Sequence, residues 1–191
     1  MRRFLPLLAG MACAAAAALP AAAYEIDPLT RQPLMPLGNS VPQATAIPRE
    51  VVSYSGRHAP GTIIISTTER RLYLVLGGGQ AMRYGVGVGR PGFDWAGTKT
   101  ITRKAEWPTW TPPAQMLKRR PDLPRFMKGG PDNPMGARAL YLGSSLYRIH
   151  GSNEPDTIGQ AVSSGCIRML NDDVIDLYNR VRVGTRVVVQ R

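Results

Sequence analysis

One cysteine and one histidine with the chemistry of a nucleophile and a base stand close together in the last third of the chain. Cys166 lies in the run Ser163-Ser164-Gly165-Cys166-Ile167-Arg168, sixteen positions after His150. A thiol in water is mostly protonated at neutral pH, so a nucleophilic cysteine needs a neighbouring base or positive charge that lowers its pKa. The pair predicts a cysteine nucleophile, with His150 as the base that lowers the pKa of the thiol.

Acyl transfer by a cysteine also needs donors aimed at the oxyanion that forms on the substrate. The backbone amides around Ser164, Gly165 and Cys166 are the candidates, because glycine lets the chain bend closely past a bound carbonyl. A metal site is not expected, since one thiol and two histidines supply three ligands and His58 lies outside the predicted domain.

The first residues have the pattern of an export signal. A cationic start, residues 1–3, precedes the apolar residues 4–19, and Ala21-Ala22-Ala23 fits the small-residue cleavage rule. We therefore expect residues 1–23 to be a cleaved signal peptide and the protein to reach the periplasm or cell envelope without stable membrane insertion. An uncleaved membrane anchor is the alternative.

Loss of this signal removes Cys13 and leaves Cys166 as the single thiol of an exported protein. An inert buried cysteine is the alternative, but serine, glycine and arginine neighbours do not resemble a core strand. The whole chain carries a formal net charge of +11, which favours anionic partners. Export argues against nucleic acid and points to the carboxylate-rich cell wall, although a generally basic surface is an equal alternative.

The chain divides into the signal, a proline-rich arm over residues 24–60 and one domain over residues 61–190. We expect the arm to be extended, without regular elements. Strands are predicted at 62–66, 71–76, 81–88, 99–102 and 186–189, with two short strands within 139–149 that deliver His150. Helices are predicted at 114–120 and from an N-cap at Asn171 to Gly184. The predicted fold is mainly β, a mixed β-sandwich or barrel with one or two flanking helices.

The site residues resemble the signature of the L,D-transpeptidase family, the YkuD-type catalytic domain. The matching residues are His150-Gly151, Ser163-Ser164-Gly165-Cys166 and Arg168, and the resemblance extends over 61–190, including Asn133-Pro134-Met135-Gly136. It implies the family's mixed β-sandwich, with Cys166 in a cleft beneath a mobile loop. It implies no metal or organic cofactor.

The reaction implied by the resemblance is peptidoglycan cross-linking. Cys166 would attack the L-centred carbonyl of the third residue in a tetrapeptide stem and expel the terminal D-alanine, and an amine of another stem would resolve the acyl-enzyme into a 3-3 cross-link. His150 would be the base, oriented by the carbonyl of Gly151, with Asp156 a weaker candidate for that task. The implied partners are the donor stem, the amine acceptor and inhibitors of the carbapenem type.

Three further side chains have two interpretations each. Arg168 is expected either to hold a substrate carboxylate or to form a salt bridge with a nearby acid such as Asp172 or Asp173. Trp107 and Trp110 line a substrate groove or pack in the core.

Other functions use the same residues. Water as acceptor would make the protein an L,D-carboxypeptidase or hydrolase, and a protein lysine would make it a protein-to-peptidoglycan ligase. A rival of another class is a non-catalytic peptidoglycan-binding protein that docks by its positive charge.

Overall fold

The computed structural model describes residues 25–26, 33–34 and 47–191. The predicted signal peptide, residues 1–23, lies outside these residues, as does much of the predicted arm. Within the described ranges, neither α-helix is long and apolar enough to cross a membrane.

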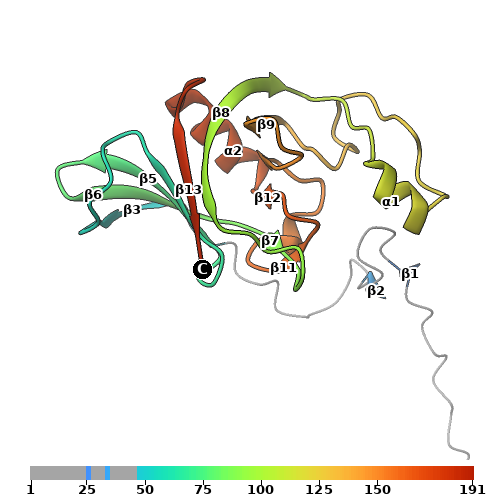
Figure 1. Ribbon diagram of the computed structural model, residues 1–191, viewed down its shortest axis with the longest axis horizontal. Coiled ribbons are helices and arrows are strands. Elements are labelled where there is room, and N and C mark those ends of the chain that lie inside the picture. Colours follow the sequence, from blue (N-terminus) through green and yellow to red (C-terminus); the bar gives the residue numbers. More distant parts are fainter. Residues whose placement is uncertain (1–24, 27–32, 35–46) are drawn as a thin grey trace, which may run out of the picture.

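Nine strands form one mixed sheet in the order β12-β10-β9-β8-β13-β4-β5-β6-β3 (Figure 1). β-Branched and aromatic residues favour strands because they pack well on a pleated surface, and they fill the central strands here. The bounds are β3 Glu50–Ser53, β4 Ile63–Ser66, β5 Arg71–Gly77, β6 Gln80–Gly85, β8 Gly97–Glu106, β9 Arg138–Leu142, β10 Arg148–His150, β12 Ile167–Arg168 and β13 Arg186–Gln190.

The long strand β8 joins the two halves of this sheet. Its first residues, 97–100, pair with β13, whereas residues 101–106 pair with β9, and the register shifts between Ile101 and Arg103. The predicted strand at 99–102 is thus part of a ten-residue strand. Since a bulge bends a strand and increases its twist, β8 turns the sheet so that its halves face each other.

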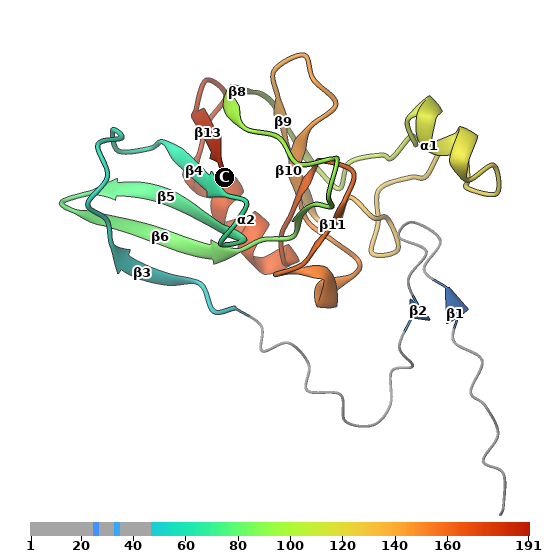
Figure 2. The same ribbon diagram turned by 60° about the horizontal axis from the view of Figure 1, so that its bottom comes forward.

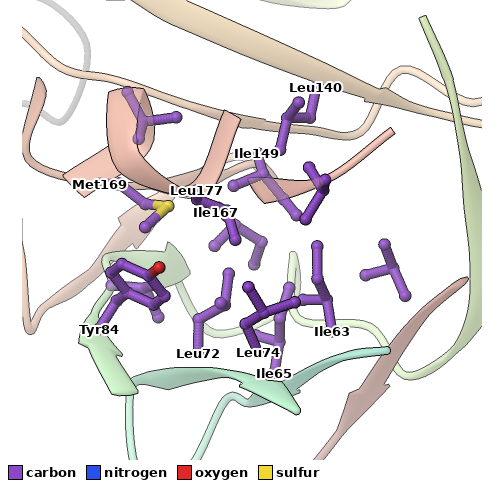
Figure 3. Close-up of a cluster of buried hydrophobic side chains, with 14 of the residues drawn as sticks. Ile63, Ile65, Leu72, Leu74, Tyr84, Leu140, Ile149, Ile167, Met169 and Leu177 are labelled. Carbon is purple, nitrogen blue, oxygen red and sulfur yellow. The ribbon is translucent and has the colours of Figure 1, made fainter. Parts of the chain in front are cut away.

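The hydrophobic core lies between these two halves. Figure 3 shows side chains from β4 and β5, such as Ile65 and Leu72, facing Ile149 and Ile167 from β10 and β12. All four have at most 1% of their surface exposed. The core therefore fixes β10 and β12, the strands that carry the candidate site, against the rest of the sheet.

Helix α2, Asn171–Arg180, covers the core beside β9 (Figure 1). It buries Val174 and Leu177, as its apolar periodicity predicts. The predicted N-cap is wrong, because Leu170 holds that position and Asn171 begins the helix. The Asn171 side chain instead accepts a hydrogen bond from the Ala137 amide at 2.9 Å and donates one to the Ser152 carbonyl at 3.1 Å. It ties the loop after His150 to the helix.

The arm contains strands, which corrects the expectation that it holds no regular element. Strand β3 pairs antiparallel with β6 at the edge of the main sheet. The two short strands β1, Glu25–Ile26, and β2, Pro33–Leu34, also pair antiparallel. Prolines exclude a segment from central strands but not from sheet edges, so β3 forms where Val51 and Val52 follow the last proline of the arm before His58.

The remaining elements surround the candidate site. A small parallel sheet joins β7, Val88–Gly89, to β11, Ala161–Ser163. Helix α1, Ala114–Arg119, lies in the long connection between β8 and β9 and extends away from the sheet (Figures 1 and 2). A short 3-10 helix, η1, Pro155–Thr157, lies between β10 and β11.

Candidate active site

His150 is the last residue of β10, and its imidazole is buried, with 5% of the residue exposed. Nδ1 lies 2.6 Å from the carbonyl oxygen of Gly151. A carbonyl only accepts hydrogen bonds, so this contact assigns the proton of the neutral ring to Nδ1 and leaves a lone pair on Nε2. Asp156, the weaker candidate for orienting the ring, is exposed on η1.

The electrostatic environment keeps the His150 imidazole neutral. Burial lowers the pKa of His150 to about 3, helped by the positive charges of Arg168 and Arg148. Backbone hydrogen bonds to Gly151 and Met135 act in the opposite direction but are outweighed. The ring is therefore in its proton-accepting form throughout the physiological pH range.

Cys166 lies between β11 and β12, and β12 pairs with β10 in parallel. The pairing sets Ile167 opposite Ile149 and Arg168 opposite His150. The cysteine directly before β12 and the histidine at the end of β10 are therefore held by two adjacent strands. The half-buried thiol donates a hydrogen bond to the Leu146 carbonyl, with Sγ 3.7 Å from the oxygen. The sequence-predicted pair thus lies in one region of the fold.

The pKa of the Cys166 thiol is raised, which contradicts the expected lowering. Burial is the main cause, because an apolar environment disfavours the thiolate. The charge and hydrogen bonds of Arg148 and the charge of Arg168 act in the opposite direction and are too weak to reverse it. Together the two pKa shifts favour a neutral thiol beside a neutral imidazole over a thiolate–imidazolium pair.

Arg148 is a site residue that sequence reasoning missed. It begins β10, two positions before His150, and residues two apart in a strand point to the same face. Both residues line the same cavity. The two-residue repeat of a β-strand was the sequence signal that could have identified Arg148 as a neighbour of His150.

The turn that carries Cys166 is held by the Ser163 hydroxyl. Ser163 Oγ donates to the Cys166 carbonyl at 2.6 Å and accepts from the Gly165 amide at 3.1 Å. The Gly165 amide, one of the expected oxyanion donors, is therefore already engaged. Within the described part of the chain, the amides of Ser164 and Cys166 have no hydrogen-bond partner, which leaves them free to bind an anionic oxygen.

Two aromatic residues that the sequence analysis did not single out brace this turn. Trp95 and Tyr147 stack with ring centroids 4.5 Å apart and an interplanar angle of 6°. The indole of Trp95 donates to the Gly165 carbonyl at 2.8 Å. Gly165 has a φ of +106°, and a Cβ there would lie 2.6 Å from Cε1 of Tyr147. Glycine is thus required at this position both by backbone conformation and by the aromatic pair.

Arg168 is buried, with 7% of its surface exposed, and it forms an ion pair with Glu154. Its Nη1 lies 2.6 Å from Oε2 of Glu154 and 3.4 Å from Oγ1 of Thr157. The expected salt bridge with a nearby acid is therefore present, but the acid is Glu154 rather than Asp172 or Asp173. Glu154 is four residues after His150, and the turn between them brings it beneath β12.

Cys166 and His150 line one cavity of about 390 Å³. Its walls come from strand β10, the β11–β12 turn, helix α1 and the loop before β9. Its lining includes aromatic rings and thioethers as well as arginines. Trp110 is 8% exposed and packs with Met135 while also lining the cavity, whereas Trp107 is 44% exposed and lies outside it. Other lining residues include Phe93, Met116, Arg119, Leu146, Ser163, Ser164 and Arg168.

His58 does not line this cavity. Across residues 47–191, no group of three or more histidine, cysteine or acidic side chains is arranged to hold a metal ion.

A family model described as the L,D-transpeptidase catalytic domain, YkuD, matches residues 60–189. The probable L,D-transpeptidase ErfK/SrfK of Escherichia coli K12 is 42% identical over 136 residues, which cover 66% of this chain and 43% of that protein. The aligned region is thus less than half of this curated relative.

Two solved structures share the fold. L,D-transpeptidase 3 from Mycobacterium tuberculosis, in complex with a faropenem-derived adduct, has a TM-score of 0.55 and 18% identity, covering 68% of this chain and 60% of that one. A Brucella melitensis protein named a probable carnitine operon oxidoreductase has a TM-score of 0.51 and 44% identity, covering 75% and 94%. The mainly β fold is thereby confirmed.

Proposed function

This chain belongs to the L,D-transpeptidase family, and from that premise we propose that it is an exported cysteine L,D-transpeptidase that cross-links peptidoglycan stems. One observation carries the proposal. The thiol of Cys166 and the neutral imidazole of His150 line the same cavity, and the free amides of Ser164 and Cys166 lie in the turn that carries the thiol. These are the nucleophile, the base and the oxyanion donors that acyl transfer requires.

Acylation begins with the neutral pair. Sγ of Cys166 attacks the carbonyl carbon of the third stem residue while Nε2 of His150 takes the thiol proton. The carbonyl oxygen becomes an oxyanion that accepts hydrogen bonds from the amides of Ser164 and Cys166. When the carbon–nitrogen bond breaks, the amine of the terminal D-alanine takes the proton from the imidazolium, leaving a thioester on Cys166.

The low pKa of His150 suits the second half of this step. A buried imidazolium is a strong acid, so the proton passes readily to the leaving amine and does not remain on the ring. The Gly151 carbonyl accepts the hydrogen bond from Nδ1 throughout, so Nε2 is the nitrogen that exchanges protons with the reacting atoms. Gly151 therefore has an orienting role.

Deacylation repeats the chemistry with a new nucleophile. An amine of a second stem attacks the thioester carbonyl, His150 removes a proton from that amine, and the carbon–sulfur bond breaks. The sulfur takes the proton back from the imidazolium, which restores the neutral pair and releases a 3-3 cross-linked product. The apolar lining of the cavity disfavours water as a competing acceptor.

Export follows from the same proposal, since cell-wall stems lie outside the inner membrane. The signal pattern of residues 1–23 supports it, and residues 24–60 then link the cleavage point to the catalytic domain. Inhibition by carbapenem-type compounds is proposed on the precedent of the L,D-transpeptidase LdtMt1, which was solved in complex with imipenem.

The test is incubation of disaccharide-tetrapeptides with the purified protein and with Cys166→Ala, followed by separation of the products. The proposal expects cross-linked dimer and free D-alanine from the wild type and neither from Cys166→Ala. Tripeptide without dimer would assign water as the acceptor and a carboxypeptidase activity. Transfer only to a protein lysine would identify a ligase, and unchanged substrate with measurable binding would identify a wall-binding protein.

A further inference from the structure

Two arginines outside the cysteine–histidine pair converge on one aromatic ring at the edge of the cavity. The guanidinium carbon of Arg90 lies 4.2 Å from the centroid of the Phe93 ring, and that of Arg119 lies 5.7 Å from it. Arg90 follows β7 and Arg119 ends α1, so two separate segments bring these charges together. Phe93 and Arg119 both line the cavity that contains Cys166.

These two charges lack a carboxylate partner. Among the described residues, ion pairs engage Arg83, Arg138, Arg168 and Arg180, whereas neither Arg90 nor Arg119 has one. Burial lowers the pKa of Arg90, and the charge of Arg119 lowers it further. Two cations that approach the same ring repel each other, and a bound anion would relieve this repulsion.

Arg90 also touches the turn that carries the nucleophile. Its Nη1 donates a hydrogen bond to Oγ of Ser164 at 3.3 Å, and Ser164 is two residues before Cys166 and lines the cavity. An anion bound by Arg90 would therefore lie on the same side of the cavity as the acylated sulfur. Arg168, the residue first considered for a substrate carboxylate, is occupied by Glu154.

We propose that Arg90 and Arg119, seated on Phe93, form a carboxylate-binding subsite that selects acidic stem peptides. The inference rests on the proposed function and names a determinant of its substrate specificity. The guanidinium groups bind the carboxylate, while apolar neighbours in the cavity, among them Trp110 and Met116, contact the aliphatic parts of the peptide. Peptides whose carboxylates are amidated bind weakly at this subsite.

Binding to full-length Cys166→Ala tests the subsite without turnover. The probes are the stem tetrapeptide, the same peptide amidated at its C-terminus and the same peptide amidated at its internal carboxylates, measured by isothermal titration calorimetry. We expect one of the amidated peptides to bind about tenfold or more weakly than the free peptide, since a charge-assisted hydrogen bond contributes at least that much. The amide that weakens binding identifies the carboxylate.

Variants in the same background complete the test. Arg90→Gln and Arg119→Gln should each weaken binding of the free peptide by about tenfold. Neither should change the affinity for the amidated peptide that binds more weakly. Arg125→Gln is the matched control. It removes an exposed charge from the β8–β9 connection that also carries Arg119, and Arg125 lies outside the cavity. Equal affinities for all three peptides, no saturable binding of any of them, or equal losses in all three variants would overturn the inference.

The two proposals fail separately. Arginine-dependent binding to Cys166→Ala without cross-linking by the wild type would contradict the transpeptidase function and leave the subsite standing. If the wild type cross-links stems, and neither the substitution of Arg90 or Arg119 nor amidation of the peptide changes binding, the subsite is contradicted. The transpeptidase function then stands.

Discussion

The indole nitrogen of Trp95 donates a hydrogen bond to the carbonyl oxygen of Gly165, 2.8 Å away and one residue before Cys166. Trp95 lies in the loop before β8, far in sequence from the turn it holds. The contact fixes the peptide between Gly165 and Cys166, and hence the direction of the Cys166 amide that the proposed mechanism uses for the oxyanion. The orientation of the Cys166 amide therefore depends on Trp95, whose hydrogen bond is to the neighbouring residue.

Trp95→Phe should slow the reaction while preserving the fold. The phenyl ring keeps a stacking partner for Tyr147 but loses the donor, so the free energy of unfolding should fall by about 1 kcal/mol. A mispositioned amide should reduce the rate of acylation by about tenfold. Stopped-flow measurement of β-lactam adduct formation checks this, with the exposed Trp107→Phe as control. An unchanged rate in Trp95→Phe would remove the proposed positioning role.

Gly165→Ala should be inactive for a geometric reason. The new Cβ would lie 2.6 Å from Cε1 of Tyr147 at a φ of +106°, so the turn must move, and a shift near 1 Å at a reacting group costs about 100-fold in rate. Gly184→Ala is the matched control, because its φ is +93° but nothing lies within 4 Å of the added methyl group. Both variants should lose about 1–2 kcal/mol of stability to the backbone conformation, but only Gly165→Ala should lose activity.

Glu154→Gln should destabilise the protein through Arg168. The Arg168 side chain is 9% exposed and its Nη1 lies 2.6 Å from the Glu154 carboxylate, so the variant leaves a buried cation without its counter-charge. We expect the free energy of unfolding to fall by about 2 kcal/mol in urea denaturation. The double variant Glu154→Gln/Arg168→Met should lose less than the sum of the two single losses. Strict additivity would mean that the pair contributes no coupling energy.

The rate of acylation should show no inflection near pH 6.5. The pKa of His150 is lowered to about 3, so the imidazole is already the neutral base at pH 5 and a rise in pH toward 8 cannot generate more of it. The raised pKa of Cys166 likewise keeps the thiol protonated across this range. Adduct formation measured from pH 5 to 8 should therefore vary by less than about twofold. A sigmoidal rise centred near the ordinary histidine pKa would show that the ring titrates as an exposed group.

Local sequence patterns account for much of the fold. The β-branched run at Ile63–Ser66 and the short strand that delivers His150 were predicted, and the apolar face of α2 was predicted from its periodicity. The spacing of His150 and Cys166 also predicted that both belong to one site, and both line the same cavity. These features depend on residues close together in the chain.

Long-range contacts account for what was missed. Strand β3 forms only because β6 offers an edge, and Trp95 reaches Gly165 across 70 residues. The pKa of the thiol was expected to fall because the sequence shows His150 as a neighbouring base but not the burial that raises this pKa. The partner of Arg168 was sought in α2, whereas the chain turn after His150 supplies Glu154.

The central claim is that Cys166 is a nucleophile served by His150, and mass spectrometry after exposure to imipenem tests it most directly. Intact mass and peptide mapping should locate one covalent adduct on Cys166 in the wild type. Cys166→Ala should show none, and His150→Gln should form the adduct at least about 100-fold more slowly. A wild-type protein that stays unmodified while iodoacetamide alkylates Cys166 freely would contradict the account.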